Sequence, residues 1–225
     1  MNKNSIKKIT SMRLFLPIVC LVAVLLVNLI TTPGFFRISI NNGVLYGYIV
    51  DVVNRASELV ILAVGMTLVT AASGGQDISV GAVMAVAAAV CCQILSGGEV
   101  SVTELAAPMG LAIIAAILAS ALCGAFNGFL VAKMNIQPMV ATLILYTAGR
   151  GIGQLITAGQ ITYVRVDSYK AMGGFLGPIP TPVIFAVAAV VVAYLVLNKT
   201  ALGMYIESVG INSHASRLIG LNSTR

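Results

Sequence analysis

The chain has 225 residues, of which 59% are hydrophobic and only 9% are charged, and its mean hydropathy is +1.01. A soluble globular domain carries roughly 25% charged residues, and a disordered chain is poor in hydrophobic residues, so both classes are excluded. The net charge of +6 at pH 7 does not indicate nucleic-acid binding, because the basic residues flank apolar runs and form no basic patch.

The apolar residues form continuous runs and do not alternate with polar ones, which predicts membrane-spanning helices and not a β-barrel. Six runs come near the 20 or so apolar residues that cross a hydrocarbon core of about 30 Å. In chain order they cover residues 14–31, 56–72, 78–95, 105–132, 139–156 and 182–197. The first run is interpreted as a retained span, because no cleavage site of small residues follows it. The sequence therefore predicts an all-α protein with about six transmembrane helices.

The two ends of the chain carry all of the excess positive charge. Segment 1–13 has four basic residues and no acidic one, and segment 198–225 has three basic residues and one acidic one. Basic residues beside membrane spans mark the cytoplasmic side, so we expect both ends there. The expected organisation is a basic cytoplasmic segment at 1–13, a transmembrane region at 14–198 and a cytoplasmic loop at 199–225.

Metal and ATP chemistry find no support in the sequence. The four cysteines lie inside apolar runs, where a thiol behaves as a small hydrophobe, and His214 is far from all of them. The cysteines and His214 therefore do not have the spacing of metal ligands. The sequence also contains no phosphate-binding loop motif, and we expect no cofactor. Acidic residues suited to an intramembrane proton relay are limited to Glu58 and Asp77, both near span ends, which disfavours an ion-coupled transporter.

Polar side chains inside the predicted spans are candidates for a solute path. Tyr146, Arg150 and Gln154 are spaced four residues apart and therefore share one helical face, and Asn127 lies in the preceding span. The alternative is interhelical hydrogen bonding, with Arg150 reaching a membrane interface.

Small residues recur at helix-packing spacing in the same two spans. The pairs are Gly124 with Gly128 and Gly149 with Gly153. We expect both pairs to let helix backbones approach closely, since lipid supplies no hydrophobic drive for helix association.

Two polar segments carry further signals. Between the second and third spans lie Gly74 and Gly75, which permit a sharp reversal, and Asp77 or Ser79, either of which is suited to capping the next helix. After the sixth span, Asn212 and Gly220 bracket a short amphipathic helix over residues 213–219. Such a helix suits docking into a groove of a soluble partner, or alternatively resting on the lipid surface.

Taken together, these segments resemble the permease subunits of bacterial ATP-binding-cassette importers for monosaccharides, of the ribose and galactoside type. The family's glycine-rich signature turn is matched by Gly74, Gly75, Asp77, Ser79 and Gly81, after an Ala-Val-Gly-Met-Thr-Leu-Val run at 63–69. Its ATPase-coupling loop is matched by Gly203, Gly210, Asn212, Ala215, Arg217 and Gly220. Further matches lie at 127–128, 131–133, 138–143 and 149–151, whereas Ser208, Ser216 and Leu221 depart from the pattern.

The resemblance implies a multi-pass permease in the bacterial cytoplasmic membrane, itself not an enzyme, with three kinds of partner. These are a cytoplasmic ATPase, an extracytoplasmic sugar-binding protein and a second permease subunit in a homo- or heterodimer. Family members have around ten spans, so we expect this chain to be a fragment or the product of a truncated gene. The alternatives are a permease for branched-chain amino acids or nucleosides, and a remnant that does not transport. The sugar itself cannot be read from the sequence.

Overall fold

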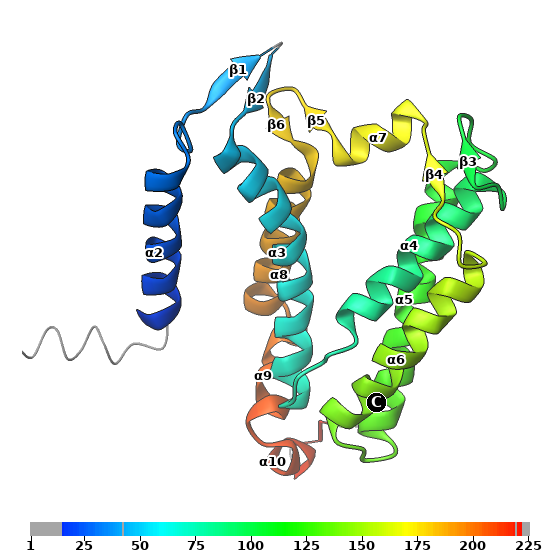
Figure 1. Ribbon diagram of the computed structural model, residues 1–225. Coiled ribbons are helices and arrows are strands. Elements are labelled where there is room, and N and C mark those ends of the chain that lie inside the picture. The colour runs from blue at the N-terminus through cyan, green and yellow to red at the C-terminus, as the bar shows by residue number, and fades with distance from the viewer. Residues whose placement is uncertain (1–14, 42, 219, 222–225) are drawn as a thin grey trace, which may run out of the picture.

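The computed structural model describes residues 15–41, 43–218, 220 and 221, and the predicted basic segment 1–13 lies outside them. Helices dominate the described part (Figure 1). They are α2 (Phe15–Thr31), α3 (Tyr48–Ser73), α4 (Val80–Ser96), α5 (Met109–Ala132), α6 (Pro138–Ile156), α7 (Asp167–Gly173), α8 (Thr181–Lys199), α9 (Ala201–Ile211) and α10 (Ser213–Leu218).

Short strands occupy the connections between helices. They are β1 (Ser39–Asn41), β2 (Val44–Tyr46), β3 (Ser101–Val102), β4 (Tyr163–Val164), β5 (Phe175–Leu176) and β6 (Ile179–Pro180). β1 pairs with β2 and β5 with β6 in antiparallel register, whereas β3 and β4 are parallel, with Ser101 opposite Tyr163. These pairs join connections at one end of the bundle and form no extended sheet (Figure 1).

The six predicted spans coincide with α2, α3, α4, α5, α6 and α8, so the expected helical class is confirmed. Four of them, α3, α5, α6 and α8, are long and apolar enough to cross a membrane, while α2 and α4 have 17 residues each. α3 begins at Tyr48 and not near residue 56, because the polar residues Asp51, Asn54 and Arg55 interrupt the apolar run without stopping the helix. Asp51 lies in the first turn, where a negative charge is favourable beside the helix dipole.

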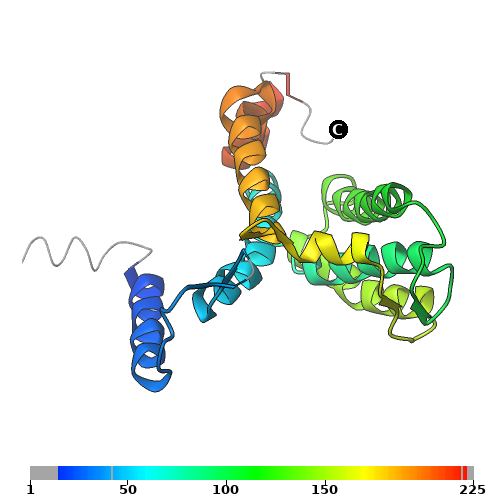
Figure 2. The same ribbon diagram turned by 90° about the horizontal axis from the view of Figure 1, so that it is seen from above.

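The helices form two groups. α4 packs against both α5 and α6, and α3 packs against α8 and α9. Figure 1 shows the α3–α8 pair beside the α4–α6 group, with α9 and α10 at the end of the bundle opposite the β-strands, and Figure 2 shows α2 standing apart. α2 is apolar except for Asn28 and Thr31 and has no buried residue.

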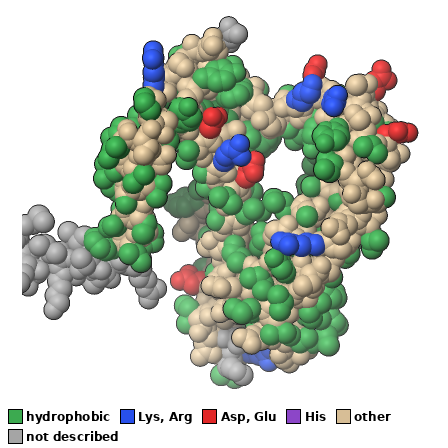
Figure 3. All heavy atoms as spheres, viewed as in Figure 1, with side chains coloured by type: hydrophobic (Ala, Val, Ile, Leu, Met, Phe, Trp, Pro, Cys, Tyr) green, Lys and Arg blue, Asp and Glu red, His purple; other side chains and the backbone are tan. Residues whose placement is uncertain are grey.

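The apolar surfaces of this bundle are largely uncovered by protein. Only 6% of the most apolar window of α3, α5 or α8 is buried, although these helices are rich in large aliphatic side chains. Hydrophobic side chains spread over the visible outer faces, which are hollowed between the α3–α8 pair and the α4–α6 group (Figure 3). Apolar patches of this extent are not stable in water, so lipid covers them, and the chain is a multi-pass membrane protein.

Close packing within the α4–α6 group depends on small residues. α6 buries Ala141, Leu145, Gly149 and Gly153 at four-residue intervals, so that they form one stripe against α4. A Cβ atom placed on Gly149 would lie 3.1 Å from the Cβ of Ala82. The expected packing role of this pair is therefore confirmed.

The expected packing role is wrong for the other pair, Gly124 and Gly128 of α5. Nothing lies within 4 Å of a Cβ atom built on either residue, and both line a cavity instead. Sequence spacing identified the small residues but not the direction they face.

Replacing Gly149 with leucine should therefore separate α6 from α4 and lower the thermal unfolding temperature of the protein in detergent. We expect a loss of about 1–3 kcal/mol, typical of an overpacked core. Gly151→Leu is the matched control, since the same helix has open space at that position. Equal unfolding temperatures for the two variants would contradict the α4–α6 packing.

Candidate functional site: the signature turn and the coupling segment

The turn between α3 and α4 reverses the chain through two glycines. Gly74 ends α3 in the left-handed conformation, with φ of 67°, and its N–H donates to the carbonyl of Thr70 at 3.0 Å. A Cβ atom on Gly75 would lie 2.6 Å from the Cβ of Pro138, the first residue of α6. The turn therefore needs glycine at Gly74 for conformation and at Gly75 for contact with α6.

A chain of polar contacts fixes the second half of the turn to α5. Both the N–H and the hydroxyl of Ser79 donate to Oδ1 of Asp77, at 2.7 and 2.6 Å. The amide Nδ2 of Asn127, in α5, donates to Oγ of Ser79 at 2.9 Å. Ser79 is 1% exposed and Asn127 is 8% exposed, so these bonds are shielded from solvent.

This arrangement differs from the expected helix cap. Ser79 stands at the N-cap of α4, yet its side chain makes no capping bond to that helix and instead donates to Asp77. Asp77 stabilises the start of α4 indirectly, by accepting the N–H of Ser79. Gly81, the last residue of the signature, has open space around its Cβ position and makes no close approach.

Thr142 is a site residue whose role sequence reasoning missed. Its Oγ1 accepts the N–H of Ile78 at 3.2 Å and donates to the carbonyl of Met139 at 3.3 Å. Thr142 is buried and thereby ties α6 to the turn. The pairing of Ser79 with Asn127 was also not predicted, because a contact between residues this far apart in sequence leaves no spacing pattern.

The segment after α8 is mostly helical, although it was expected as a loop. α9 was not predicted, whereas α10 falls where the bracketing residues placed it: Oδ1 of Asn212 accepts the N–H of Ala215 at 3.0 Å, and Gly220 has φ of +89°. Ser216 is buried, and its hydroxyl donates to the carbonyl of Ser208 at 2.8 Å, which fastens α10 to α9. Leu218 is 90% exposed, so this apolar side chain of α10 is uncovered.

Two glycines allow α9 its close packing. A Cβ atom on Gly203 would contact the carbonyl oxygen of Leu197, in α8, and one on Gly210 would contact the carbonyl oxygen of Ala71, in α3. Both contacts are to backbone, which cannot rotate away as a side chain does. Gly210 therefore fixes the end of α9 against the end of α3.

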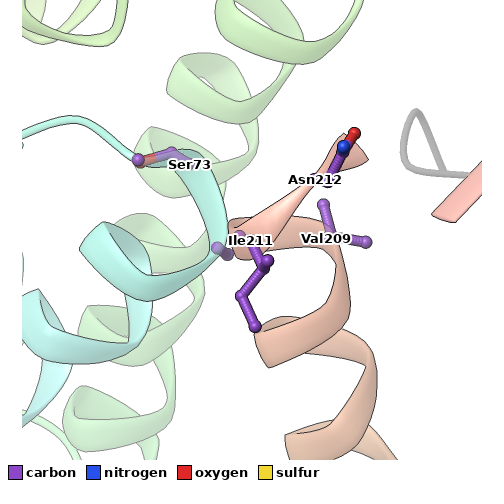
Figure 4. Close-up of a pocket in the computed structure, with 7 residues that line it drawn as sticks. Ser73, Val209, Ile211 and Asn212 are labelled. Atoms are coloured by element: carbon purple, nitrogen blue, oxygen red, sulfur yellow. The ribbon is translucent and has the colours of Figure 1, made fainter. Parts of the chain in front are cut away.

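The signature turn and the α9–α10 segment consequently meet. A small cavity of about 340 Å³ lies between residues 72–74 and residues 209–212. Figure 4 shows the end of α3, which carries Ser73, beside the segment that carries Val209, Ile211 and Asn212. The two motifs, far apart in sequence, form one structural unit.

A second cavity, of about 780 Å³, extends from this unit to α5 and α6. Its wall includes Asp77 from the turn, Asn127 from α5, Thr142 from α6, and Tyr205 and Arg217 from the α9–α10 segment. The structure thus brings Asp77, Asn127 and Arg217 to one site, although the sequence placed them in three separate groups.

The predicted stripe on α6 lies outside both cavities. The guanidinium carbon of Arg150 is 4.6 Å from the centre of the Tyr146 ring, a cation–π contact, and Arg150 and Gln154 are exposed. Asn127 is therefore separated from the other three residues proposed for the path.

At the other end of the bundle, α7 contacts α4 through Tyr169. The hydroxyl of Tyr169 lies 3.8 Å from Sγ of Cys92. Burial, with a smaller effect of Cys92, raises the pKa of Tyr169 to about 12. The phenol is therefore neutral at physiological pH. Tyr169 lines neither of the two cavities.

The family comparison covers this whole unit. Residues 48–225 match the family described as "Branched-chain amino acid transport system / permease component". The chain belongs to this family. The match includes the signature turn, both cavities and the α9–α10 segment, and excludes α2.

Three curated relatives are named as permeases for sugars. The chain is 45% identical to the galactofuranose transporter permease protein YtfT of Escherichia coli K12, over 92% of this chain and 58% of the relative. It is 35% identical to the fructose import permease protein FruF of Bifidobacterium longum, over 97% and 61%. It is 34% identical to the ribose import permease protein RbsC of Escherichia coli K12, over 85% and 56%.

The chain thus spans somewhat less than two thirds of the length of these relatives. No solved structure gives a significant match.

Proposed function

We propose that this chain is the membrane-spanning permease subunit of an ATP-driven importer for a monosaccharide. The observation that carries the proposal is its similarity to proteins named as galactofuranose, fructose and ribose permeases, each over at least 85% of this chain. Its partners would be a cytoplasmic ATPase, an extracytoplasmic sugar-binding protein and a second permease subunit. ATP hydrolysis would take place in the ATPase and bias the permease between outward-facing and inward-facing states.

The α9–α10 segment is the proposed docking element for the ATPase. It is held rigidly to α3 and α8 by Gly210 and Gly203, and it presents the uncovered Leu218. A short helix with an exposed apolar face is the form in which helices insert into a groove of a partner. The excess of basic residues near both chain ends supports a cytoplasmic location for this segment.

Asn212→Ala should weaken ATPase association, because it removes the cap of α10, worth about 1 kcal/mol. We expect a roughly fivefold loss of affinity for the ATPase in a pull-down from detergent-solubilised membranes, with the spans still folded. Asn198→Ala is the control, since the amide of Asn198 donates within its own helix, to the carbonyl of Tyr194. Unchanged association of Asn212→Ala would remove α10 from the docking surface.

Branched-chain amino acids are the second candidate substrate, because the family's description names them. The two candidates separate in an uptake assay. The permease, its ATPase and its binding protein are placed in proteoliposomes, and ATP-dependent uptake of labelled galactose, ribose and fructose is compared with uptake of labelled leucine. We expect saturable uptake of one of the sugars, with no competition by leucine. ATP-dependent leucine uptake without sugar uptake would overturn the proposal.

A further inference from the structure

We infer that the cavity of about 780 Å³ is a monosaccharide-binding site, one wall of which is the proposed ATPase-docking segment. This inference rests on the proposed function and assigns its substrate to a place in the molecule. The site lies at the end of the bundle where α9 and α10 pack, and not along the polar stripe of α6.

The size and the composition of the cavity suit a sugar. Small-molecule sites have volumes of about 300–1,000 Å³ and combine apolar walls with a few well-placed polar groups. Here Gln76 and Asp77 contribute polar side chains, and Val131 and Val209 contribute apolar ones. Tyr205 adds an aromatic ring. Monosaccharides present hydroxyl groups around their edges and apolar C–H groups on their faces, so they require both kinds of wall.

The location links the solute to the ATPase. Tyr205, Val209 and Arg217 belong to the docking segment, while Asp77 and Asn127 belong to the junction of the signature turn with α5. A displacement of α9–α10 by the ATPase would change one wall of the site and leave the other in place. Solute affinity and ATPase binding are then coupled, and the coupling is reciprocal.

Gly128→Leu tests the site by filling it. Gly128 lines the cavity, no atom lies within 4 Å of its Cβ position, and leucine favours the helix more than glycine does. Gly110→Leu is the matched control, because it lies in the same helix with equally open space and does not line the cavity. Binding of galactose, ribose and fructose to each purified protein in nanodiscs is measured by equilibrium dialysis, and ATP-dependent uptake is measured in parallel.

We expect Gly128→Leu to weaken binding of the transported sugar at least tenfold, and Gly110→Leu to bind within twofold of the unsubstituted protein. Sugar uptake by the unsubstituted protein, together with equal sugar affinity in both variants or no measurable binding at all, would overturn the site and leave the proposed function standing. Leucine uptake without sugar uptake would overturn the proposed function and, with it, the sugar site.

Discussion

Gly210→Leu is expected to lower ATP-dependent uptake at least a hundredfold and to abolish association with the ATPase. The Cβ atom of any larger residue at this position would collide with the carbonyl oxygen of Ala71, and neither backbone can yield without moving a helix. α9 would be displaced from α3, and α10 would move with it because Ser216 bonds to Ser208. Uptake into proteoliposomes and pull-down of the ATPase measure the two effects.

Gly110→Leu provides the control for this substitution as well, since it adds the same side chain to a helix position with open space. Both variants should reach the membrane in similar amounts. If Gly210→Leu retained ATPase binding and uptake close to those of Gly110→Leu, the rigid attachment of α9 to α3 would not be needed for coupling, and that part of the account would fail.

Asp77→Ala is expected to have the second largest effect, a loss of most uptake together with a lower unfolding temperature. The substitution removes the acceptor of both the N–H and the hydroxyl of Ser79, which is 1% exposed. Leaving buried donors unpaired costs about 1–3 kcal/mol each. The bond from Asn127 would also lose its orientation, because the Ser79 hydroxyl would be free to rotate.

Asp77→Asn should restore much of the stability, since its Oδ1 still accepts both bonds. Asp167→Ala is the control for removing an aspartate, because the side chain of Asp167 is 99% exposed and its ion pair with the exposed Lys170 is worth little. Wild-type uptake and unfolding temperature in Asp77→Ala would reduce the turn to a dispensable connection.

Local features of this protein could be predicted from its sequence. Apolar runs located all six long helices, and Asn212 with Gly220 located α10, because each signal depends on residues close together in the chain. The early start of α3 was not predicted. An apolar run indicates only the part of a helix that lies in the membrane, whereas α3 also includes polar residues before that part.

The site itself depended on contacts that no local pattern encodes. Gly124 and Gly149 look alike in sequence, yet Gly149 packs against Ala82 and Gly124 lines the large cavity. Asn127 has the same polarity as Gln154, but only Asn127 meets Ser79. The rotation of each helix about its own axis decides which of these residues face a neighbouring helix and which face the cavity. That rotation depends on packing against helices elsewhere in the chain.

Cross-linking tests whether the signature turn and the α9–α10 segment form one unit in the membrane. Cysteines at Ala72 and Val209, which line both cavities, are introduced after the four native cysteines have been replaced. A pair at Ser101 and Tyr163, which face each other between β3 and β4, is the positive control, and a pair at Ala72 and Leu155 is the negative control.

We expect a short bifunctional thiol reagent to join Ala72→Cys to Val209→Cys in membranes, as detected by mass spectrometry after proteolysis. Cross-linking of the positive control pair without any cross-link between these two positions would contradict it.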